Sequence, residues 1–196
     1  MKKTVLPMLA CLLLLCGCGG RKALDVQEQY RSVTSAELEA EVVSCADAAG
    51  RVFTLTCRYD PAGQSVTTVK APSELAGLTA VLAGDTLSVR SGDTLLPAGA
   101  STDVCLANCL PYLLDALSGG YLTEQNEEQL GDTPCLRLAL DTVGRSGAPV
   151  QCAVWLDKVT LIPLYGEFSQ NGQVVLTVKM LSFTCQTEGQ LLWNPH

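Results

Sequence analysis

Apolar and polar residues alternate with a period of two along most of this chain. In residues 36–42 the apolar side chains are separated by Glu37, Glu39 and Glu41, which indicates a half-buried strand with one solvated face. The same period recurs in later segments, which we predict to be strands: 51–59, 134–140, 150–156, 164–168 and 173–185. Further strands are predicted in the Val- and Thr-rich residues 64–71 and at about 78–82 and 86–90. Asn171-Gly172 is a strong signal for a two-residue hairpin turn between 164–168 and 173–185. Because the strands follow one another in runs, without a strand–helix–strand rhythm, the sheet should be antiparallel.

Two segments have helical spacing instead. A short amphipathic helix is expected within residues 19–35, after a flexible Gly-Gly pair. The longer helix is predicted over 101–118; it begins with Ser-Thr-Asp as an N-cap, ends at Gly119-Gly120 and contains Pro111, where we expect a kink or a break. Its apolar stripe consists of Leu106, Leu110, Leu113 and Leu117. The Gly/Pro-containing residues 91–100 before it are predicted to be a loop.

The first residues read as an export signal. Lys2-Lys3 precedes an apolar run from Val5 to Leu15, and this order of charge and apolar core is typical of a secretory signal peptide. The run is too short for a membrane-spanning helix, which needs about 20 apolar residues. The following Leu15-Cys16-Gly17-Cys18 resembles the lipobox of bacterial lipoproteins. That resemblance implies cleavage before Cys18 and attachment of lipid to its thiol, and two acyl chains give stable anchoring.

Other cysteines in this region fit the lipobox less well. Cleavage before Cys11 would leave more apolar sequence on the product, and Cys16 is preceded by Leu15, where a small residue is needed. We therefore expect the mature protein to lie outside the cytoplasmic membrane, held by lipid on Cys18. The expected parts are a signal peptide (1–17), a lipidated tether (18–23), one folded domain (24–185) and a C-terminal tail (186–196).

Charge and composition argue against several classes of function. The chain of 196 residues has a formal net charge of −7, which argues against nucleic acid as a partner. His196 is the only histidine, so neither a Ser-His-Asp nor a Cys-His catalytic pair is plausible. The nucleophile, zinc and phosphate-binding motifs are absent, and Asp157 with Glu167 is explained as well by ordinary surface pairing. We expect no enzyme activity, no cofactor and no metal.

Seven of the ten cysteines lie beyond Cys18, an odd number. If 134–140 and 150–156 form a hairpin, Cys135 and Cys152 do not fall opposite each other. We expect most of these thiols to be free and buried as small apolar core residues.

The C-terminal third resembles a known family. Residues 154–177 contain an aromatic-Leu-Asp strand end, a turn, a Leu-Pro strand and an Asn-Gly hairpin, in an order similar to that of the lipoprotein-carrier superfamily, LolA/LppX-like. The resemblance implies a mainly β (α+β) fold, a curved antiparallel sheet forming an incomplete, half-open β-barrel with covering helices. It also implies an apolar concave face that takes acyl chains.

Two functions are consistent with this resemblance. One is a lipoprotein that binds acyl chains, a lipoprotein tail or another apolar ligand in the half-barrel. Our candidates for lining residues, any of which could be ordinary core, are Phe53, Leu55, Leu138, Val154, Leu164, Phe168 and Leu176. The alternative is a lipoprotein that docks or senses a membrane protein partner, with the cavity filled by the leucine stripe of the helix.

Overall fold

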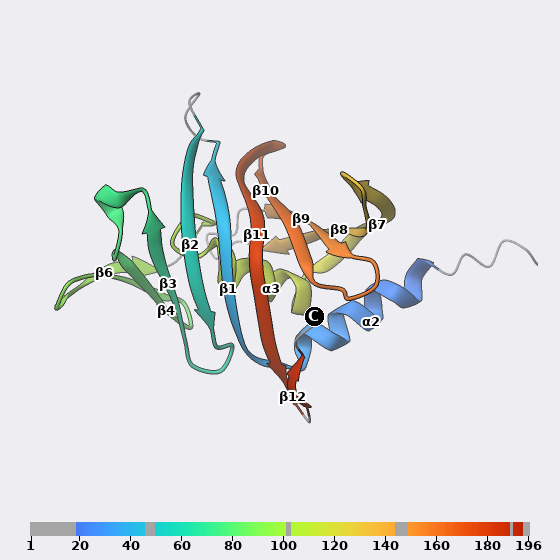
Figure 1. The fold of residues 1–196 in the computed structure, drawn as a ribbon, viewed down its shortest axis with the longest axis horizontal. Coiled ribbons are helices and arrows are strands. Elements are labelled where there is room, and N and C mark those ends of the chain that lie inside the picture. Colours follow the sequence, from blue (N-terminus) through green and yellow to red (C-terminus); the bar gives the residue numbers. More distant parts are fainter. Residues whose placement is uncertain (1–18, 46–49, 101–102, 144–148, 189, 194–196) are drawn as a thin grey trace, which may run out of the picture.

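A single antiparallel sheet dominates the computed structural model, which describes residues 19–45, 50–100, 103–143, 149–188 and 190–193 (Figure 1). The strand order is β6-β5-β4-β3-β2-β1-β11-β10-β9-β8-β7, and β12 pairs with β11 beside this path. The strands are β1 (Val33–Ser44), β2 (Arg51–Tyr59), β3 (Gln64–Ala71), β4 (Thr79–Ala83), β5 (Thr86–Ser91), β6 (Thr94–Ala100), β7 (Tyr121–Leu130), β8 (Thr133–Val143), β9 (Pro149–Asp157), β10 (Pro163–Gln170), β11 (Gln173–Thr187) and β12 (Gln190–Trp193).

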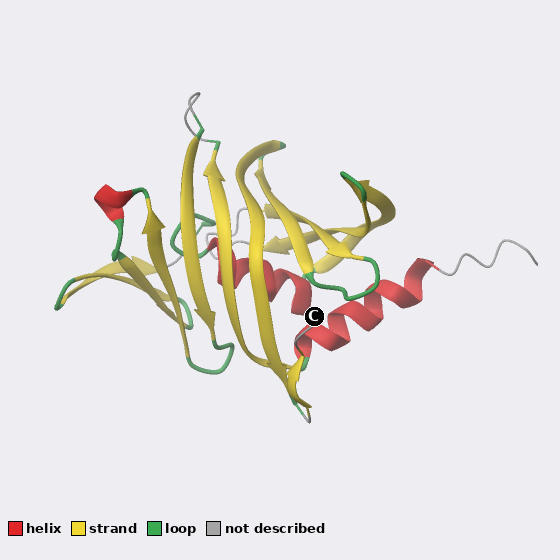
Figure 2. Cartoon of the chain, in the orientation of Figure 1, coloured by secondary structure: helices red, strands yellow, loops and turns green. Residues whose placement is uncertain are grey.

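Two meanders are joined at the centre of the sheet. The first six strands follow one another in space, as do β7 to β11, and the long pairing of β1 with β11 connects the two halves. Among the described strands, β6 and β7 remain the two ends of the path, so the sheet is curved but open. The helices α2 (Gly19–Arg31) and α3 (Cys109–Gly119) lie on one side of it (Figure 2). The expected half-open antiparallel barrel with covering helices is therefore confirmed.

The strands with strong alternation form where the sequence predicts them. β2 spans the predicted residues 51–59, with Phe53, Leu55, Cys57 and Tyr59 all buried on one face. The Asn171-Gly172 hairpin also forms, and both residues have positive φ, 52° and 75°, as a type I′ turn requires. Both signals depend only on neighbouring residues, so the predictions made from them agree with the folded sheet.

The two helices differ from their predicted limits. α2 spans Gly19–Arg31, so the Gly-Gly pair lies within it, and it ends at Arg31 because Val33 enters β1. The expected signal peptide and Cys18 lie outside the described residues. The prediction of a helix over 101–118 is wrong for its first part. Before α3, the Asn108 side chain accepts a hydrogen bond from the Cys105 N–H (2.8 Å) and donates one to the Asp103 carbonyl (2.8 Å), which stabilises a turn instead.

Pro111 causes no break in α3. It is the third residue of the helix, a position whose backbone N–H has no intrahelical acceptor. The missing N–H of proline therefore costs no hydrogen bond there.

The two edge strands, β6 and β7, were not predicted from the sequence. Residues 91–100 were expected to be a loop, but β6 forms within them, and Pro97 is tolerated because an edge strand has one unpaired side. At the other edge, the polar β7 pairs with β8 and leaves most of its side chains exposed. Its sequence has too few apolar residues to show an alternation, and only pairing reveals it as a strand.

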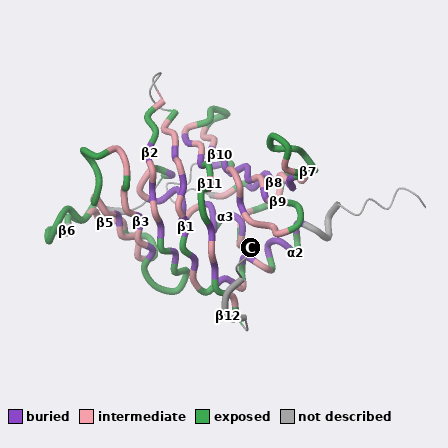
Figure 3. Tube along the Cα trace, viewed as in Figure 1, coloured by how far each residue is buried: buried purple, intermediate pink, exposed green. Residues whose placement is uncertain are grey.

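The core lies between the concave face of the sheet and α3. Figure 3 shows buried segments along the central strands. Leu110, Leu113 and Leu117 of the predicted stripe are at most 1% exposed. Gly166 on β10 allows this close approach, because a Cβ at that position would lie 2.7 Å from Cδ1 of Leu113. α3 therefore packs against β10 at the one position, Gly166, where the strand has no side chain in the way.

We predict that Gly166→Val destabilises the domain by ~1–3 kcal/mol, because the added side chain overpacks the contact with Leu113. Urea unfolding followed by circular dichroism measures the change. Glu167→Val, on the opposite face of the same strand, is the control and should cost less. Combined with Leu113→Ala, the Gly166→Val change should cost less than it does alone; a strictly additive double variant would contradict the contact.

The seven cysteines of the described residues are all free. Five of them are buried, and Cys45 and Cys105 are exposed. Cys135 pairs with Asp157 and Cys152 with Leu140, so the expectation that these two cysteines do not face each other is confirmed. Burial raises the pKa of the Cys57 thiol to about 12, and it also raises the pKa of Cys109 and Cys152.

A soluble chain beginning at Gly19 should therefore show seven reactive thiols in denaturant without reductant, measured with a chromogenic disulfide reagent. In the native state at pH 8, the two exposed thiols should react rapidly, and the other five should react slowly because burial disfavours the thiolate. A count below seven in denaturant would show that disulfides form.

Candidate functional site

Most of the residues proposed to line a cavity lie beneath α3. Leu138, Val154 and Phe168 are fully buried and Leu176 is 4% exposed, all in one core cluster that includes the stripe of α3. Leu164 is only half-buried, since a β-bulge between Pro163 and Tyr165 interrupts the alternation of β10. These positions form packed core, and the helix occupies the space in front of them.

Phe53 and Leu55 have a different environment. They line an apolar cavity of about 130 Å³ on the β2–β5 half of the sheet. The other lining residues are Thr67, Val69, Leu75, Leu78, Ala80, Val89, Leu106 and Ala107. All but three of these fall on predicted strands, and Leu106 falls on the predicted stripe, but no local pattern indicates that they share a cavity.

The cavity exists because the cover of the sheet is uneven. α3 spans only Cys109–Gly119 and packs mainly in front of the strands that carry Leu138, Val154 and Phe168. The preceding turn, with Leu106 and Ala107, reaches over β2 to β5 and leaves the cavity under it. A helix over the whole of 101–118 would have added about two helical turns in this region, so the turn at Asn108 creates the space.

One polar contact fixes α3 against the β2 side. The Tyr59 hydroxyl donates a hydrogen bond of 2.7 Å to the Asp115 carboxylate. Burial, together with the charge of Asp115, raises the pKa of Tyr59 well above its usual value, so the phenol stays protonated as a donor. This contact ties α3 to the last residue of β2.

Two larger hollows are more polar. One of about 430 Å³ runs along α3 and is bordered by Asp115 and Asp141, and one of about 580 Å³ lies along the Glu37 and Glu39 side of β1. Carboxylates at the walls of both would oppose burial of an alkyl chain. The smaller apolar cavity is therefore the better candidate for an apolar ligand.

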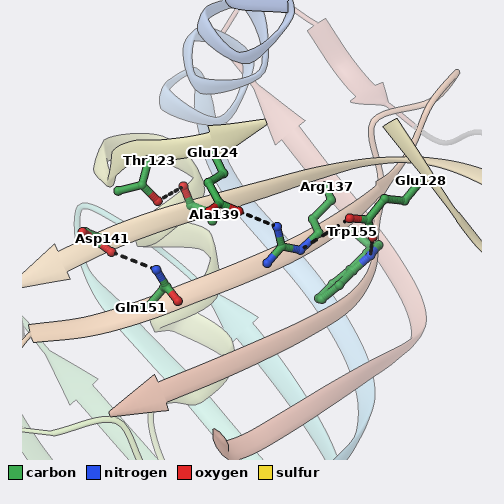
Figure 4. A network of polar contacts seen from close by, with 8 residues as sticks. All are labelled: Thr123, Glu124, Glu128, Arg137, Ala139, Asp141, Gln151 and Trp155. Atoms are coloured by element: carbon green, nitrogen blue, oxygen red, sulfur yellow. Dashed lines mark hydrogen bonds and ion pairs between the residues drawn. The ribbon is translucent and has the colours of Figure 1, made fainter. Parts of the chain in front are cut away.

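A polar network covers the outer face of β7, β8 and β9 (Figure 4). Arg137 forms an ion pair with Glu124 (3.0 Å) and stacks over the Trp155 ring, 5.2 Å from its centroid. The Trp155 indole N–H donates to Glu128 at 2.8 Å. These charged side chains are partnered across neighbouring strands, so the network binds the polar edge strand β7 to the sheet.

The described residues contain no group of three or more metal-binding side chains. Asp157 is occupied locally: its carboxylate accepts hydrogen bonds from the N–H groups of Val159 (2.9 Å) and Thr160 (2.7 Å). These bonds lower its pKa, and its role is to hold the β9–β10 turn. Across the described helices, none has the length and apolar character needed to span a membrane.

Comparison with known proteins shows similarity of fold. No family model matches the chain, and no curated protein matches its sequence. An uncharacterized conserved protein from Thermus thermophilus has a TM-score of 0.50 at 14% identity, over 85% of this chain and 87% of that one. A DUF1329 family protein from Desulfovibrio piger gives a TM-score of 0.50 at 14% identity, over 86% of both chains.

The LolA superfamily protein NE2245 from Nitrosomonas europaea is also similar, with a TM-score of 0.47 at 13% identity, over 85% of this chain and 93% of that one. At these identities the likeness concerns the fold alone. The chain thus shares the overall fold of the proteins from Thermus thermophilus and Desulfovibrio piger.

Proposed function

We propose that the protein is an extracytoplasmic lipoprotein, anchored through Cys18, that binds an acyl chain or another apolar ligand. The observation that carries this proposal is the apolar cavity under Leu106 and Ala107. Nine of its ten lining residues are apolar, and Thr67 is the exception. Such a wall favours alkyl groups, since each buried methylene contributes about 0.8 kcal/mol.

The size of the cavity limits what it holds. Pockets for whole drug-sized ligands measure ~300–1,000 Å³. The cavity of about 130 Å³ therefore fits the end of one acyl chain or a small apolar group, with the rest of the ligand outside. Leu75, which is 41% exposed, provides apolar surface at its border for the continuing chain.

The alternative function, docking or sensing a membrane protein partner without lipid cargo, has one observation in its favour. α3 fills the concave face in front of Leu138, Val154 and Phe168, which are at 0% exposure. Directly in front of these three side chains there is no space for a ligand. If the apolar cavity under Leu106 and Ala107 binds no ligand, docking to a membrane protein partner becomes the better explanation of the function.

We further propose that the protein is not an enzyme. Its single histidine, His196, lies outside the described residues, and Asp157 is engaged in its own turn. The chain has no sequence motif for a nucleophile or a phosphate.

A soluble chain beginning at Gly19 should bind a fluorescent fatty acid, and Ala80→Leu should weaken that binding about tenfold, or ~1.4 kcal/mol. Ala80 is a lining residue, so the larger side chain fills the cavity without adding a charge. Ala83→Leu adds the same bulk three positions along β4, where the side chain is not part of the cavity wall, and should leave affinity unchanged. Fluorescence titration measures affinity, and thermal melting confirms that both variants fold. No binding by the unaltered domain would favour the docking function.

Cys18→Ser should abolish lipid attachment and the cleavage that precedes it. Incorporation of labelled palmitate in cells measures the attachment, and gel mobility measures the cleavage. Continued labelling of the variant would assign the lipid to Cys11 or Cys16 instead.

A further inference from the structure

The folded domain begins directly after the proposed lipid site. α2 starts at Gly19, and Ala23 and Val26 are fully buried against the rest of the domain. Five helical steps from Cys18 to Ala23 measure about 7.5 Å. Even a fully extended chain would span only about 17 Å over those five steps. Lipid on Cys18 would therefore leave almost no free tether.

α2 cannot swing away from the domain to lengthen this connection. The Gln27 side chain donates to the Gly120 carbonyl (2.7 Å), and Arg31 donates to the Ser118 carbonyl (2.8 Å). The Tyr30 hydroxyl donates to the Leu161 carbonyl at 2.8 Å, which ties α2 to the turn between β9 and β10. Figure 1 shows this turn beside α2.

Exposed apolar side chains lie on both of these elements. Leu24, in the first turns of α2, is 63% exposed, and Val159, in the β9–β10 turn, is 90% exposed. Val159 is the most exposed large apolar residue among those described. Insertion into the apolar part of a membrane interface would remove the apolar surface of these two side chains from water.

The turn that carries Val159 is ordered in advance. Besides the backbone N–H bonds of Val159 and Thr160, the Asp157 carboxylate accepts the Thr160 hydroxyl at 3.0 Å. The Lys158 N–H donates to the Pro134 carbonyl at 3.1 Å. Presenting Val159 to a lipid surface thus requires little loss of backbone freedom.

Charge next to this position is largely compensated. The Lys158 ammonium forms an ion pair of 2.6 Å with Glu127 on β7. The carboxylate of Asp157 is occupied by the three donors of its own turn. The Val159 side chain can therefore approach the headgroup region without bringing an unpaired charge.

We infer that the start of α2 and the β9–β10 turn form a membrane-docking surface that rests on the outer leaflet, with Leu24 and Val159 inserted between headgroups. This inference depends on the proposed lipid at Cys18 and goes beyond it, because it fixes the orientation of the domain. The bilayer is the occupant, since the proposed lipid on Cys18 lies only five residues before the buried Ala23. β1 begins two residues after the end of α2, and Val52 pairs with Val43 near the other end of β1, so we expect Val52 to lie away from the membrane.

The test uses the lipidated protein in liposomes of phosphatidylglycerol and phosphatidylethanolamine that contain nitroxide-labelled lipid. A bimane probe is placed by Val159→Cys or, as the matched control, Val52→Cys, each with Cys45→Ser and Cys105→Ser to remove the exposed thiols. Val52 is also an exposed valine, at 55%. Lipid nitroxides should quench the probe at position 159 at least about threefold more strongly than the probe at position 52.

A second comparison tests the apolar contact itself. Leu24→Asp should reduce the quenching at position 159, because a carboxylate resists entry into the interface. Val174→Asp, at an exposed apolar site of 39% beside the Asn171-Gly172 turn, should not change it. Circular dichroism confirms folding of each variant.

Equal quenching at positions 159 and 52, in protein shown to carry palmitate on Cys18, overturns the docking surface and leaves the anchor intact. Absence of palmitate on the unaltered chain overturns both the anchor and the docking surface. Binding of fatty acid by the soluble domain is measured separately, so ligand binding can succeed or fail independently of either result.

Discussion

The need to cover one apolar face of an open sheet governs this structure. Strands with period-two alternation place their apolar side chains on the concave side, and an open sheet cannot bury that face against itself. α3 provides the cover, and it can approach because Gly166 leaves room for Leu113. The eleven residues of α3 are too few to cover both halves. The apolar cavity is the part of the concave face that the helix does not reach.

Prediction from sequence succeeded where the signal is local. The alternation of Phe53, Leu55, Cys57 and Tyr59 defines β2, and Asn171-Gly172 defines the β10–β11 hairpin, because side-chain period and turn geometry depend on neighbouring residues. The edge strands β6 and β7 were missed because their formation depends on a partner strand. The start of α3 was misplaced because the Asn108 side chain bonds the backbone of Asp103 and Cys105, which competes with the helix.

The candidate site illustrates the same division between local and long-range information. Alternation correctly placed Phe53, Leu138, Val154 and Phe168 on buried positions. It could not tell which of them face a helix and which face a cavity, since that depends on where α3 begins. Phe53 lines the cavity and Leu138 lies in the packed core, although both satisfy the same pattern.

The two helices connect the proposed membrane end of the molecule with its cavity. Gln27 and Arg31 of α2 donate to the Gly120 and Ser118 carbonyls at the C-terminal end of α3. On the β2 side of α3, Asp115 accepts a hydrogen bond from the Tyr59 hydroxyl, which ties the helix to the last residue of β2. A force or a displacement at α2 therefore acts on the same helix that determines how much of the concave face is open. α2, next to the proposed lipid site, thus supports the helix that borders the proposed ligand site, which a long flexible tether would not do.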